Sequence, residues 1–403
     1  MNLLKSLKTW GMFAVRKIGV KIMQIPFNRI YLTGKEKQYI EDALQRRELS
    51  ANGYYTKKVT ELLESKFSLD KVFMTTSCTH ALEMAADLIG LEEGDEVIMP
   101  SFTFPSTANA VISRGARPVF AEIKNSTFNI DPVDIEKKIT AKTRALIPVH
   151  YGGVGCEMDE ICYLAAKYRL YIIEDAAQGI NASYKDSYLG GIGDLACYSF
   201  HSSKNYISGE GGALVINNSS DELKERAEII REQGTNKGSF LRGEVDKYTW
   251  VDKGSSYLPS DLLMAVLYAQ LEEMDNIKNM RQKLFNDYYK GLEDFLDLPF
   301  LDSISHIPEN RDSNYHIFYL KFNSGQIRDL VLNRLQMRGI STAFHYIPLH
   351  SSPMGGKLGY KADDLKISKE VGETILRLPL YPELSQEQLR YIIDNIADIF
   401  REL

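Results

Sequence analysis

One lysine, Lys204, lies in the run YSFHSSKNYISGEGG (198–212), whose residues are mostly small or polar and which ends in closely spaced glycines. Taken alone, a lysine is most often a solvated surface charge. A buried or crowded lysine has a lowered pKa, so its amine is nucleophilic and can form a Schiff base with a carbonyl group. The small residues would leave room beside Lys204 for a molecule that carries this carbonyl.

A pair of carboxylates stands in IIEDAAQG (172–179), where an apolar strand delivers Glu174 and Asp175 to its end. A carboxylate at the end of a strand can pair with a protonated ring nitrogen or bind a metal ion. No cluster of His, Cys and Asp supports a metal, so we predict none. The alternative for Asp175 is a cap of the next turn.

Two further strand ends carry candidate ligand contacts. In TTSCTHAL (75–82) a strand passes through small hydroxyl residues into a helix, and the free N–H groups and dipole of such a junction suit a phosphate. The alternative is an ordinary N-cap by Ser77 or Thr79. In PSFTFPST (100–107), Phe104 could lie flat over a planar ring, although an aromatic residue there is more often part of the core.

These four signals together are what pyridoxal phosphate (PLP) requires. The cofactor needs a phosphate anchor, an aromatic residue over its ring, a carboxylate for its pyridine nitrogen and a lysine for its aldehyde. Asp175 would keep the ring nitrogen protonated, and the freed Lys204 amine would carry a proton as general acid and base. The sequence therefore predicts PLP chemistry centred on Lys204.

The elements that must position these residues alternate between short apolar strands and helical patterns, which predicts a largely parallel α/β sheet with ligands at the C-terminal ends of its strands. Helices are expected at 79–89 and 158–168. Strands are expected at 71–76, 95–100, 117–123, 143–151, 170–176, 195–200 and 212–218.

The pattern changes after Ser260. Two long helices, about 260–274 and 276–295, lead into a smaller α+β region with strands near 315–322 and 341–346. A chain of 403 residues is long for one core. We therefore expect a large cofactor-binding domain and a small C-terminal domain, with the boundaries 1–24 (basic extension), 25–265 (large domain) and 266–403 (small domain).

The composition of the chain limits the kinds of partner and the compartment that we expect for it. The net charge of −6 does not favour nucleic acid, and no run approaches the about 18 apolar residues of a spanning helix. The four cysteines show no CxxC pair, which predicts free thiols in a reducing compartment, the cytoplasm. The first 35 residues lack any acidic residue. They are expected to be a dispensable leader, with a basic amphipathic helix on a membrane surface as the alternative.

The chain resembles the nucleotide-sugar aminotransferases, a fold-type I PLP family, from about Ile25 to its C-terminus. The resemblance rests on TSCTHALEMA, GDEVIMPSFTFPSTANA, IPVHYGGVGCEMD, IIEDAAQG, YSFHSSKN, GEGGALVIN and FHYIPLH, in that order. Residues 231–262 resemble the subgroup that makes dTDP-4-amino-4,6-dideoxygalactose. Members of that subgroup begin close to IPFN, which suggests Met23 as a start.

The resemblance implies a role for each matching residue. Lys204 would be the Schiff-base lysine, Asp175 the partner of the pyridine nitrogen, and Phe104 the residue stacked on the ring. Gln178 would approach the ring hydroxyl, and the phosphate would be held by Cys78, Thr79 and Ser199. Ser256 stands where many relatives carry an asparagine that reaches the neighbouring subunit's cofactor, which implies a homodimer with shared active sites. His345 and Tyr346 would border the sugar site, or else only pack between domains.

The activity that the resemblance implies is amination of dTDP-4-keto-6-deoxy-D-glucose to dTDP-4-amino-4,6-dideoxy-D-galactose with L-glutamate as donor. Some relatives replace the lysine with histidine and dehydrate, so Lys204 favours transamination. One alternative is an aminotransferase acting at C3 or on a UDP-linked keto-sugar. A second, from another class, is a PLP-binding scaffold at a membrane without turnover.

Overall fold

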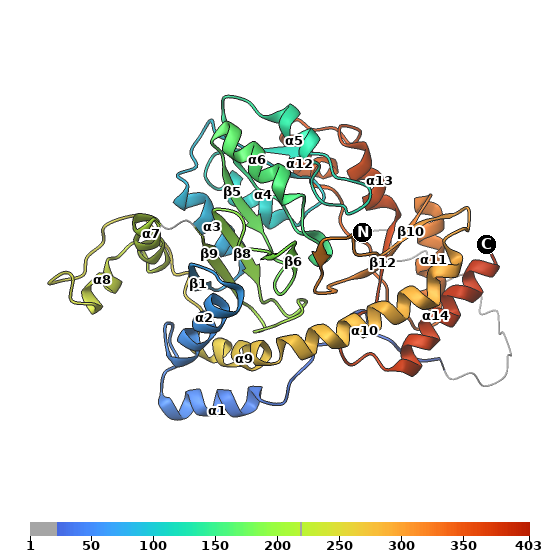
Figure 1. Ribbon diagram of the computed structural model, residues 1–403, viewed down its shortest axis with the longest axis horizontal. Coiled ribbons are helices and arrows are strands. Elements are labelled where there is room, and N and C mark those ends of the chain that lie inside the picture. Colours follow the sequence, from blue (N-terminus) through green and yellow to red (C-terminus); the bar gives the residue numbers. More distant parts are fainter. Residues whose placement is uncertain (1–21, 218–219) are drawn as a thin grey trace, which may run out of the picture.

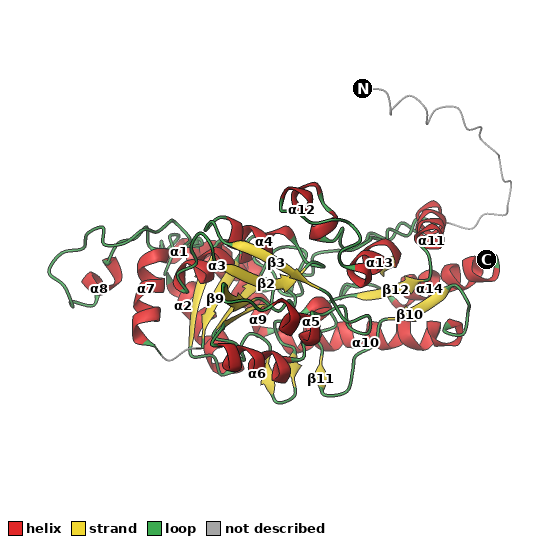
Figure 2. Ribbon diagram, turned by 90° about the horizontal axis from the view of Figure 1, so that it is seen from above, coloured by secondary structure: helices red, strands yellow, loops and turns green. Residues whose placement is uncertain are grey.

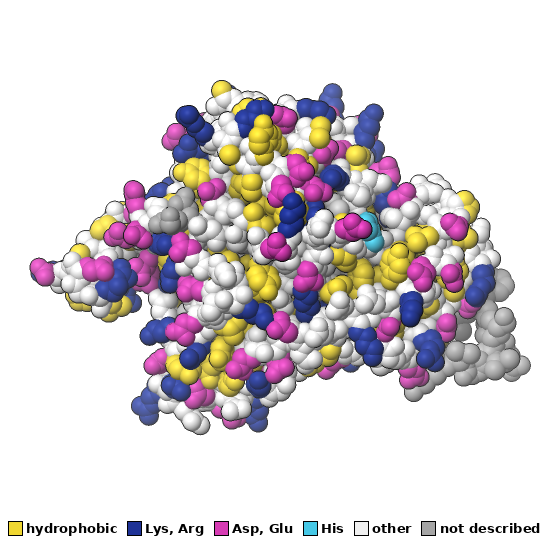
Figure 3. Space-filling model, viewed as in Figure 1, with side chains coloured by type: hydrophobic (Ala, Val, Ile, Leu, Met, Phe, Trp, Pro, Cys, Tyr) yellow, Lys and Arg dark blue, Asp and Glu magenta, His cyan; other side chains and the backbone are white. Residues whose placement is uncertain are grey.

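The computed structural model describes residues 22–217 and 220–403. The expectations placed on residues 1–21 lie outside these described residues. Within them, no helix combines the length and the hydropathy that a membrane span needs. Acidic and basic side chains are intermixed over the face shown in Figure 3, without a continuous basic surface.

A seven-stranded sheet forms the larger part of the molecule, in the order β1-β9-β8-β5-β4-β2-β3. Strand β9 is antiparallel to both of its neighbours, and the remaining pairs between β8 and β3 are parallel. The strands are β1 (Lys71–Thr75), β2 (Glu96–Pro100), β3 (Arg117–Ala121), β4 (Thr143–Leu146), β5 (Tyr171–Asp175), β8 (Leu195–Ser199) and β9 (Gly212–Ile216).

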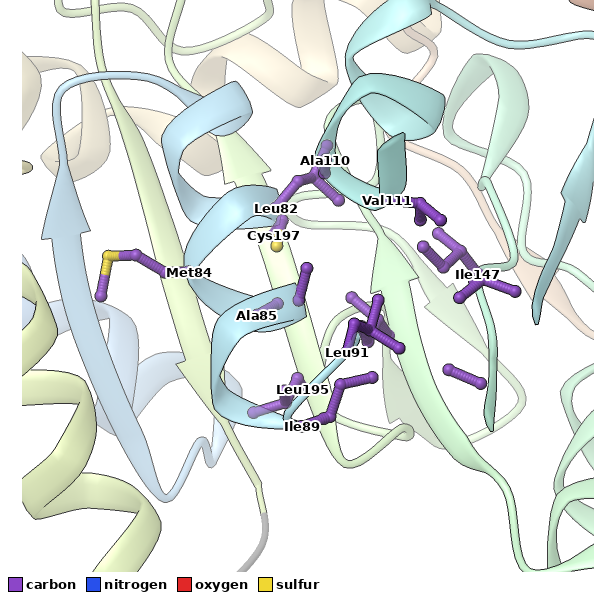
Figure 4. Packing of buried hydrophobic residues seen from close by; sticks show 14 of the residues in the cluster. Leu82, Met84, Ala85, Ile89, Leu91, Ala110, Val111, Ile147, Leu195 and Cys197 are labelled. Atoms are coloured by element: carbon purple, nitrogen blue, oxygen red, sulfur yellow. The ribbon is translucent and has the colours of Figure 1, made fainter. Parts of the chain in front are cut away.

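Helices cover both faces of this sheet, which is why its strands are nearly apolar throughout (Figure 1). Alternate residues of one strand point to opposite faces: Leu195 and Cys197 of β8 pack in one cluster, Ala196 and Tyr198 in another. Figure 4 shows the first cluster, with Leu195 and Cys197 lying beside the helix that carries Leu82, Met84 and Ala85. The surrounding helices are α1 (Glu36–Arg46), α2 (Tyr54–Phe67), α3 (Cys78–Leu88), α4 (Pro105–Ile112), α5 (Pro132–Lys138), α6 (Met158–Tyr168), α7 (Asp221–Arg231) and α9 (Asp261–Glu272).

The C-terminal part has its own sheet and its own apolar cluster. Strands β10 (Leu301–Ile304), β12 (Phe318–Phe322) and β13 (Ile375–Leu378) pair in that order. Their buried side chains pack with those of the long helix α10 (Met274–Leu292). The other helices of this part are α11 (Gly325–Met337), α12 (Pro353–Lys357), α13 (Lys366–Thr374) and α14 (Gln386–Arg401). Figures 1 and 2 show α10 running from the end of α9 along the C-terminal part.

Short elements complete the fold. A small sheet contains β11 (Arg311–Asp312), β6 (Ser183–Tyr184) and β7 (Ser187–Tyr188), and the 3₁₀ turns are η1 (Tyr151–Gly153), η2 (Glu293–Phe295) and η3 (Leu349–Ser351). Helix α8 (Lys237–Leu241) lies on a segment that projects away from the body in Figures 1 and 2.

Most of the predicted elements are confirmed, within a few residues at their ends. Two strand predictions need correction. The strand predicted at 143–151 ends at Leu146, because the chain then turns through η1 and only Val149 forms a further bridge, to Asp175. The strand predicted at 341–346 is wrong: its only bridge joins Ala343 to Arg377, and the chain then runs along a cavity instead of a sheet.

Candidate active site

A cavity of about 760 Å³ lies at the C-terminal ends of strands β1, β2, β5 and β8. This is the edge at which a parallel α/β sheet binds its ligands. The predicted residues that line it are Cys78, Thr79, Phe104, Asp175, Gln178, Ser199, Lys204, His345 and Tyr346. The fold thus brings together, from distant parts of the sequence, every predicted site residue except Ser256.

Lys204 lies in the loop between β8 and β9, where its backbone N–H donates to the carbonyl oxygen of His201. Burial lowers the pKa of its amine, although the nearby Cys78 and Asp175 oppose this shift. Within residues 22–217 and 220–403, no side chain forms a hydrogen bond or an ion pair with this amine. The structure therefore provides an amine whose pKa is lowered and that is free to react.

Asp175 ends β5 with its carboxylate fixed at both oxygens. Oδ2 accepts a 2.7 Å hydrogen bond from the hydroxyl of Thr107, and Oδ1 accepts one of 3.2 Å from the backbone N–H of Ala177. Burial raises the pKa of Asp175, while these two donors oppose the shift. The cap predicted as an alternative is therefore present, and it holds the same carboxylate in the cavity. A desolvated carboxylate of this kind favours a cationic partner.

Glu174, the other carboxylate of the predicted pair, has a structural role. It accepts hydrogen bonds from the backbone N–H groups of Gly190, Ile192 and Gly193, and its Oε2 lies 2.8 Å from Nε2 of His150. Adjacent residues of a strand face opposite sides, so only Asp175 reaches the cavity.

The N-terminus of α3 forms the anion-binding corner of the cavity. Ser77 is the N-cap, and its hydroxyl accepts a hydrogen bond from His80 N–H, which confirms the capping alternative. The N–H groups of Cys78 and Thr79 in the first turn have no intrahelical acceptor. A Cβ at Gly212 would stand 2.4 Å from Cys78 N, so only glycine allows β9 to pass this close to the helix. The close approach leaves Ser199, opposite Gly212 in the sheet, beside the same corner.

Phe104 lies between β2 and α4, and its side chain is 60% exposed while lining the cavity. The alternative that placed this aromatic residue in the core is therefore wrong. Pro105, at the start of α4, has a backbone angle suited to a first helical residue and fixes where Phe104 leaves the strand.

Gln178 connects the large sheet to the C-terminal part of the chain. Its Oε1 accepts a 2.7 Å hydrogen bond from Gly152 N–H, and its Nε2 donates one of 2.9 Å to the hydroxyl of Tyr346. His345 Nδ1 lies 3.1 Å from the hydroxyl of Tyr151, and the His345 and Tyr346 rings are 3.6 Å apart. His345 and Tyr346 thus both line the cavity and hold the two parts of the chain together.

Ser256 is exposed and does not line the cavity of its own chain. Its backbone pairs with Glu232 in an isolated bridge on the projecting segment that carries α8. Because its predicted contact is with a neighbouring subunit, this role stays a prediction.

Sequence reasoning missed three residues of the site: Thr107, His316 and Arg377, all of which line the cavity. Thr107 stands in the quoted stretch PSFTFPST, where a hydroxyl in the first helical turn was the available signal. Arg377 stands in ILRLPL, where a single cation in an apolar run was the signal. His316 follows Asn314 and Tyr315 without any pattern of its own.

Residues 31–397 match the sequence profile of the DegT/DnrJ/EryC1/StrS aminotransferase family. The chain belongs to this family. It is 30% identical over 382 residues to the GDP-perosamine synthase of Escherichia coli O157:H7. This alignment covers 94% of this chain and 99% of that protein. It is 31% identical over 381 residues to the dTDP-3-amino-3,4,6-trideoxy-alpha-D-glucose transaminase of Streptomyces venezuelae, which covers 93% and 96% of the two chains.

Solved structures agree with this assignment. The PLP-form of Spr1654 from Streptococcus pneumoniae matches with a TM-score of 0.87 and 25% identity, covering 94% of this chain and 99% of that chain. The predicted fold class, a fold-type I PLP-dependent transferase with a mostly parallel sheet and a smaller α+β part, is confirmed. The predictions of an aminotransferase and of PLP as its cofactor are also confirmed, and the alternative of a scaffold without turnover is set aside.

The residues present fit this cofactor. The reactive amine of Lys204, the fixed carboxylate of Asp175 and the open N-terminus of α3 face one cavity. Gly212 permits β9 to lie close to the start of α3, so the anion-binding corner belongs to the same cavity.

Proposed function

We propose that this protein converts dTDP-4-keto-6-deoxy-D-glucose to dTDP-4-amino-4,6-dideoxy-D-galactose with L-glutamate as the amino donor. The observation that carries the aminotransfer is the placement of Lys204 and Asp175 in one cavity with the free N–H groups of α3. The choice of this sugar rests on residues 231–262, which resemble the subgroup that makes this product.

PLP, when bound, draws electrons from the substrate carbon so that a proton can leave it. The chain's own residues do the rest. Lys204 is the residue that would hold the cofactor, and its amine would take up the α-proton of glutamate and later deliver a proton to the sugar carbon. Asp175, fixed by Thr107 and Ala177, would hold the positive charge of the ring nitrogen.

The remaining predicted residues bind and orient. Phe104 would cover one face of the ring, and Gln178 would approach the ring hydroxyl. Cys78 and Thr79 would hold the phosphate through the start of α3, together with the hydroxyl of Ser199. The side of the sugar carbon that faces Lys204 decides between an axial and an equatorial amine.

We also propose that the active unit is a homodimer, with Ser256 reaching the partner's cofactor. The projecting segment supports this, because it exposes large apolar side chains that a monomer would leave in water. Leu241 is 71% exposed and Trp250 is 77% exposed, and both lie on this segment. We also propose that the chain divides into a large domain, residues 25–265, and a small domain, residues 266–403.

A different keto-sugar is the second candidate. Relatives of similar identity are named for a GDP-linked sugar and for a dTDP-linked 3-amino sugar, so family membership alone does not select the nucleotide or the carbon. A cytoplasmic site of action is part of the proposal, and the four cysteines, all free, suit a reducing compartment.

Product analysis with a panel of substrates tests the proposal. The purified holoenzyme is incubated with glutamate and, separately, with dTDP-4-keto-6-deoxyglucose, a dTDP-linked 3-keto sugar, and UDP- and GDP-linked 4-keto sugars. Mass spectrometry and NMR then identify each product. The proposal expects the first sugar to be preferred and to receive an axial amine at C4. Preference for another member of the panel, or an equatorial amine, would overturn it.

A further inference from the structure

The loop that carries Lys204 is shaped by its own backbone. The N–H group of Lys204 donates to the carbonyl oxygen of His201, and that of Ser202 donates to the carbonyl oxygen of Gly209. These bonds act within the loop, so the place of the loop in the cavity depends on side chains that reach other parts of the chain. Asn205, the residue after Lys204, is buried and has such a side chain.

The side-chain amide of Asn205 contacts one short segment of the C-terminal part, residues 314–316. Its Nδ2 donates a 2.8 Å hydrogen bond to the backbone oxygen of Asn314, and its Oδ1 lies 2.8 Å from Nδ1 of His316. A backbone oxygen can only accept, so the first contact fixes which end of the amide is the nitrogen. The second contact then requires a proton on Nδ1 of His316.

His316 lines the cavity and has a single defined polar contact. Burial and the nearby Lys204 hold the pKa of His316 well below its usual value, so its ring is neutral at neutral pH and carries one proton. That proton is the one donated to Asn205. In the part of the chain that the structure describes, no group forms a hydrogen bond with the other ring nitrogen, Nε2. The ring of His316 is thus joined by hydrogen bonding only to the residue next to Lys204.

Arg281 holds the backbone of His316 in place. This buried arginine lies on the long helix α10. Its Nε donates a 2.9 Å hydrogen bond to the backbone oxygen of Tyr315, and its Nη2 donates one of 2.7 Å to the backbone oxygen of His316. Because both bonds come from a rigid guanidinium, the imidazole meets Asn205 from a fixed position.

Asn314 connects the same segment to the turn that follows Asp175. Its Nδ2 donates to the backbone oxygens of Gln178 and Ile180, over 2.7 and 2.8 Å. Residues 314–316 therefore join the loop of Lys204 to the turn of Asp175 through buried hydrogen bonds. A network of this kind is rigid when all of its members are paired.

We propose that His316 is a positioning residue for Lys204. It acts through Asn205, and it fixes where the Lys204 amine stands relative to the carboxylate of Asp175. The amine and the carboxylate must meet opposite ends of one rigid cofactor ring, and a misplacement of about 1 Å can lower a rate about 100-fold. The inference concerns the aminotransfer itself and does not depend on which sugar is used.

Two substitutions separate the two nitrogens of His316. In His316→Asn the amide nitrogen stands as many bonds from Cα as Nδ1 does, so the donor to Asn205 is kept. In His316→Gln the amide nitrogen stands as far out as Nε2, so this donor is lost while a polar side chain remains. We expect His316→Asn to resemble wild type and His316→Gln to be impaired.

Hydrogen–deuterium exchange of the cofactor-free protein tests the position of the loop without any reaction. We expect the backbone amides of residues 202–208 to exchange about tenfold faster in His316→Gln than in wild type and His316→Asn. Helix α7 is the internal reference and should exchange equally in all three proteins. Faster exchange of both segments in His316→Gln would mean that residue 316 only stabilises the fold, and would overturn the inference.

The donor half-reaction tests the consequence for Lys204. Absorbance follows conversion of the holoenzyme to its pyridoxamine form by L-glutamate alone. In His316→Gln we expect the maximal rate constant to fall about 10- to 100-fold and the half-saturating glutamate concentration to stay unchanged, because proton transfer is impaired and binding is not. Glutamate with deuterium on its α-carbon should react more slowly in this variant. Absence of an isotope effect there would overturn the inference.

A second variant shows whether His316 acts through Asn205. If it does, adding His316→Gln to Asn205→Ala should slow the half-reaction no further than Asn205→Ala alone. A further fall, or recovery by His316→Gln together with loss in His316→Asn, would assign the role to Nε2 and overturn the inference. If glutamate converts the enzyme but dTDP-4-keto-6-deoxyglucose is not aminated, the proposed sugar fails, and the inference is still decided by the exchange and donor data.

Discussion

The hydroxyl of Thr107, on α4, donates a 2.7 Å hydrogen bond to the buried carboxylate of Asp175 at the end of β5. The hydroxyl oxygen of Thr107 in turn lies 2.9 Å from the hydroxyl oxygen of Thr103. This contact orients the hydroxyl of Thr107 that donates to Asp175. Helix α4 thus positions Asp175, the residue expected to hold the cofactor's ring nitrogen. From the sequence, the junction between strand and helix at this place was considered only for Phe104.

Thr107→Val should weaken PLP binding by about 10- to 100-fold, since a hydrogen bond to a charged group contributes about 1.5–3 kcal/mol. Valine keeps the shape of threonine and removes only the donor. Thr107→Ser keeps the hydroxyl and is expected to bind PLP nearly as wild type does. Titration of apo-protein with PLP, followed by absorbance, gives both affinities. Equal affinities in wild type and Thr107→Val would show that Thr107 does not position Asp175.

Gly212→Ala should destabilise the protein and impair cofactor binding. The added Cβ would stand 2.4 Å from the backbone of Cys78 and of Ser77, and backbone atoms in a helix start cannot move aside cheaply. Gly356→Ala is the control: it adds the same methyl group on the exposed helix α12, where nothing lies within 4 Å. A thermal melt should show a lower melting temperature only for Gly212→Ala. Equal melting temperatures would contradict the close approach of β9 and α3.

Removal of the Lys204 amine should stabilise the cofactor-free protein at neutral pH. Burial lowers the pKa of Lys204 below 10.5, so the charged amine costs folding stability at every pH below its folded pKa. This cost disappears as the pH rises through the folded pKa towards 10.5. Apo Lys204→Met should therefore melt above apo wild type at pH 7, by about 1 °C per kcal/mol in a chain of this size.

The pH series supplies the decisive comparison for this variant. The difference in melting temperature between Lys204→Met and wild type should narrow between pH 7 and pH 10. Lys57→Met removes an exposed lysine of α2 and should show no such narrowing. If the difference in melting temperature between Lys204→Met and wild type stays constant from pH 7 to pH 10, Lys204 is not desolvated.

Trp250→Glu should produce a monomer with little activity. Trp250 is 77% exposed on the projecting segment, and a charge there would oppose burial of the segment against a second copy of the chain. Tyr163→Glu, at a 66% exposed position of α6, is the matched control and should stay a dimer. Light scattering after gel filtration gives the mass of each variant. A dimeric, active Trp250→Glu would move the interface elsewhere.

Much of the fold could be predicted because the strands of the large sheet are covered on both faces. Runs such as VFMT and YIIED are therefore apolar enough to be recognised without knowing their partners. The strands β10 and β13 escaped prediction, since each has only four residues and takes its register from β12 rather than from its own pattern.

The residues of the site fall into the same two groups, those that local sequence indicates and those that it does not. Asp175 ends a strand and Lys204 lies in the loop that follows one, both beside small residues, so local sequence indicates them. Arg377 reaches the cavity because β13 pairs with β12 and Ala343 across more than thirty residues of chain, and no local pattern carries that information. Contacts made by tertiary packing are the part that a single sequence leaves hidden.

Borohydride reduction of the holoenzyme shows directly whether Lys204 carries the cofactor. Reduction of the holoenzyme makes the bond between lysine and cofactor permanent, and peptide mass spectrometry then locates the added mass. We predict a single modified peptide, with the cofactor on Lys204, and none after prior conversion of the enzyme by glutamate. Modification of a different lysine, or no covalent attachment in a fully loaded enzyme, would show that Lys204 does not carry the cofactor.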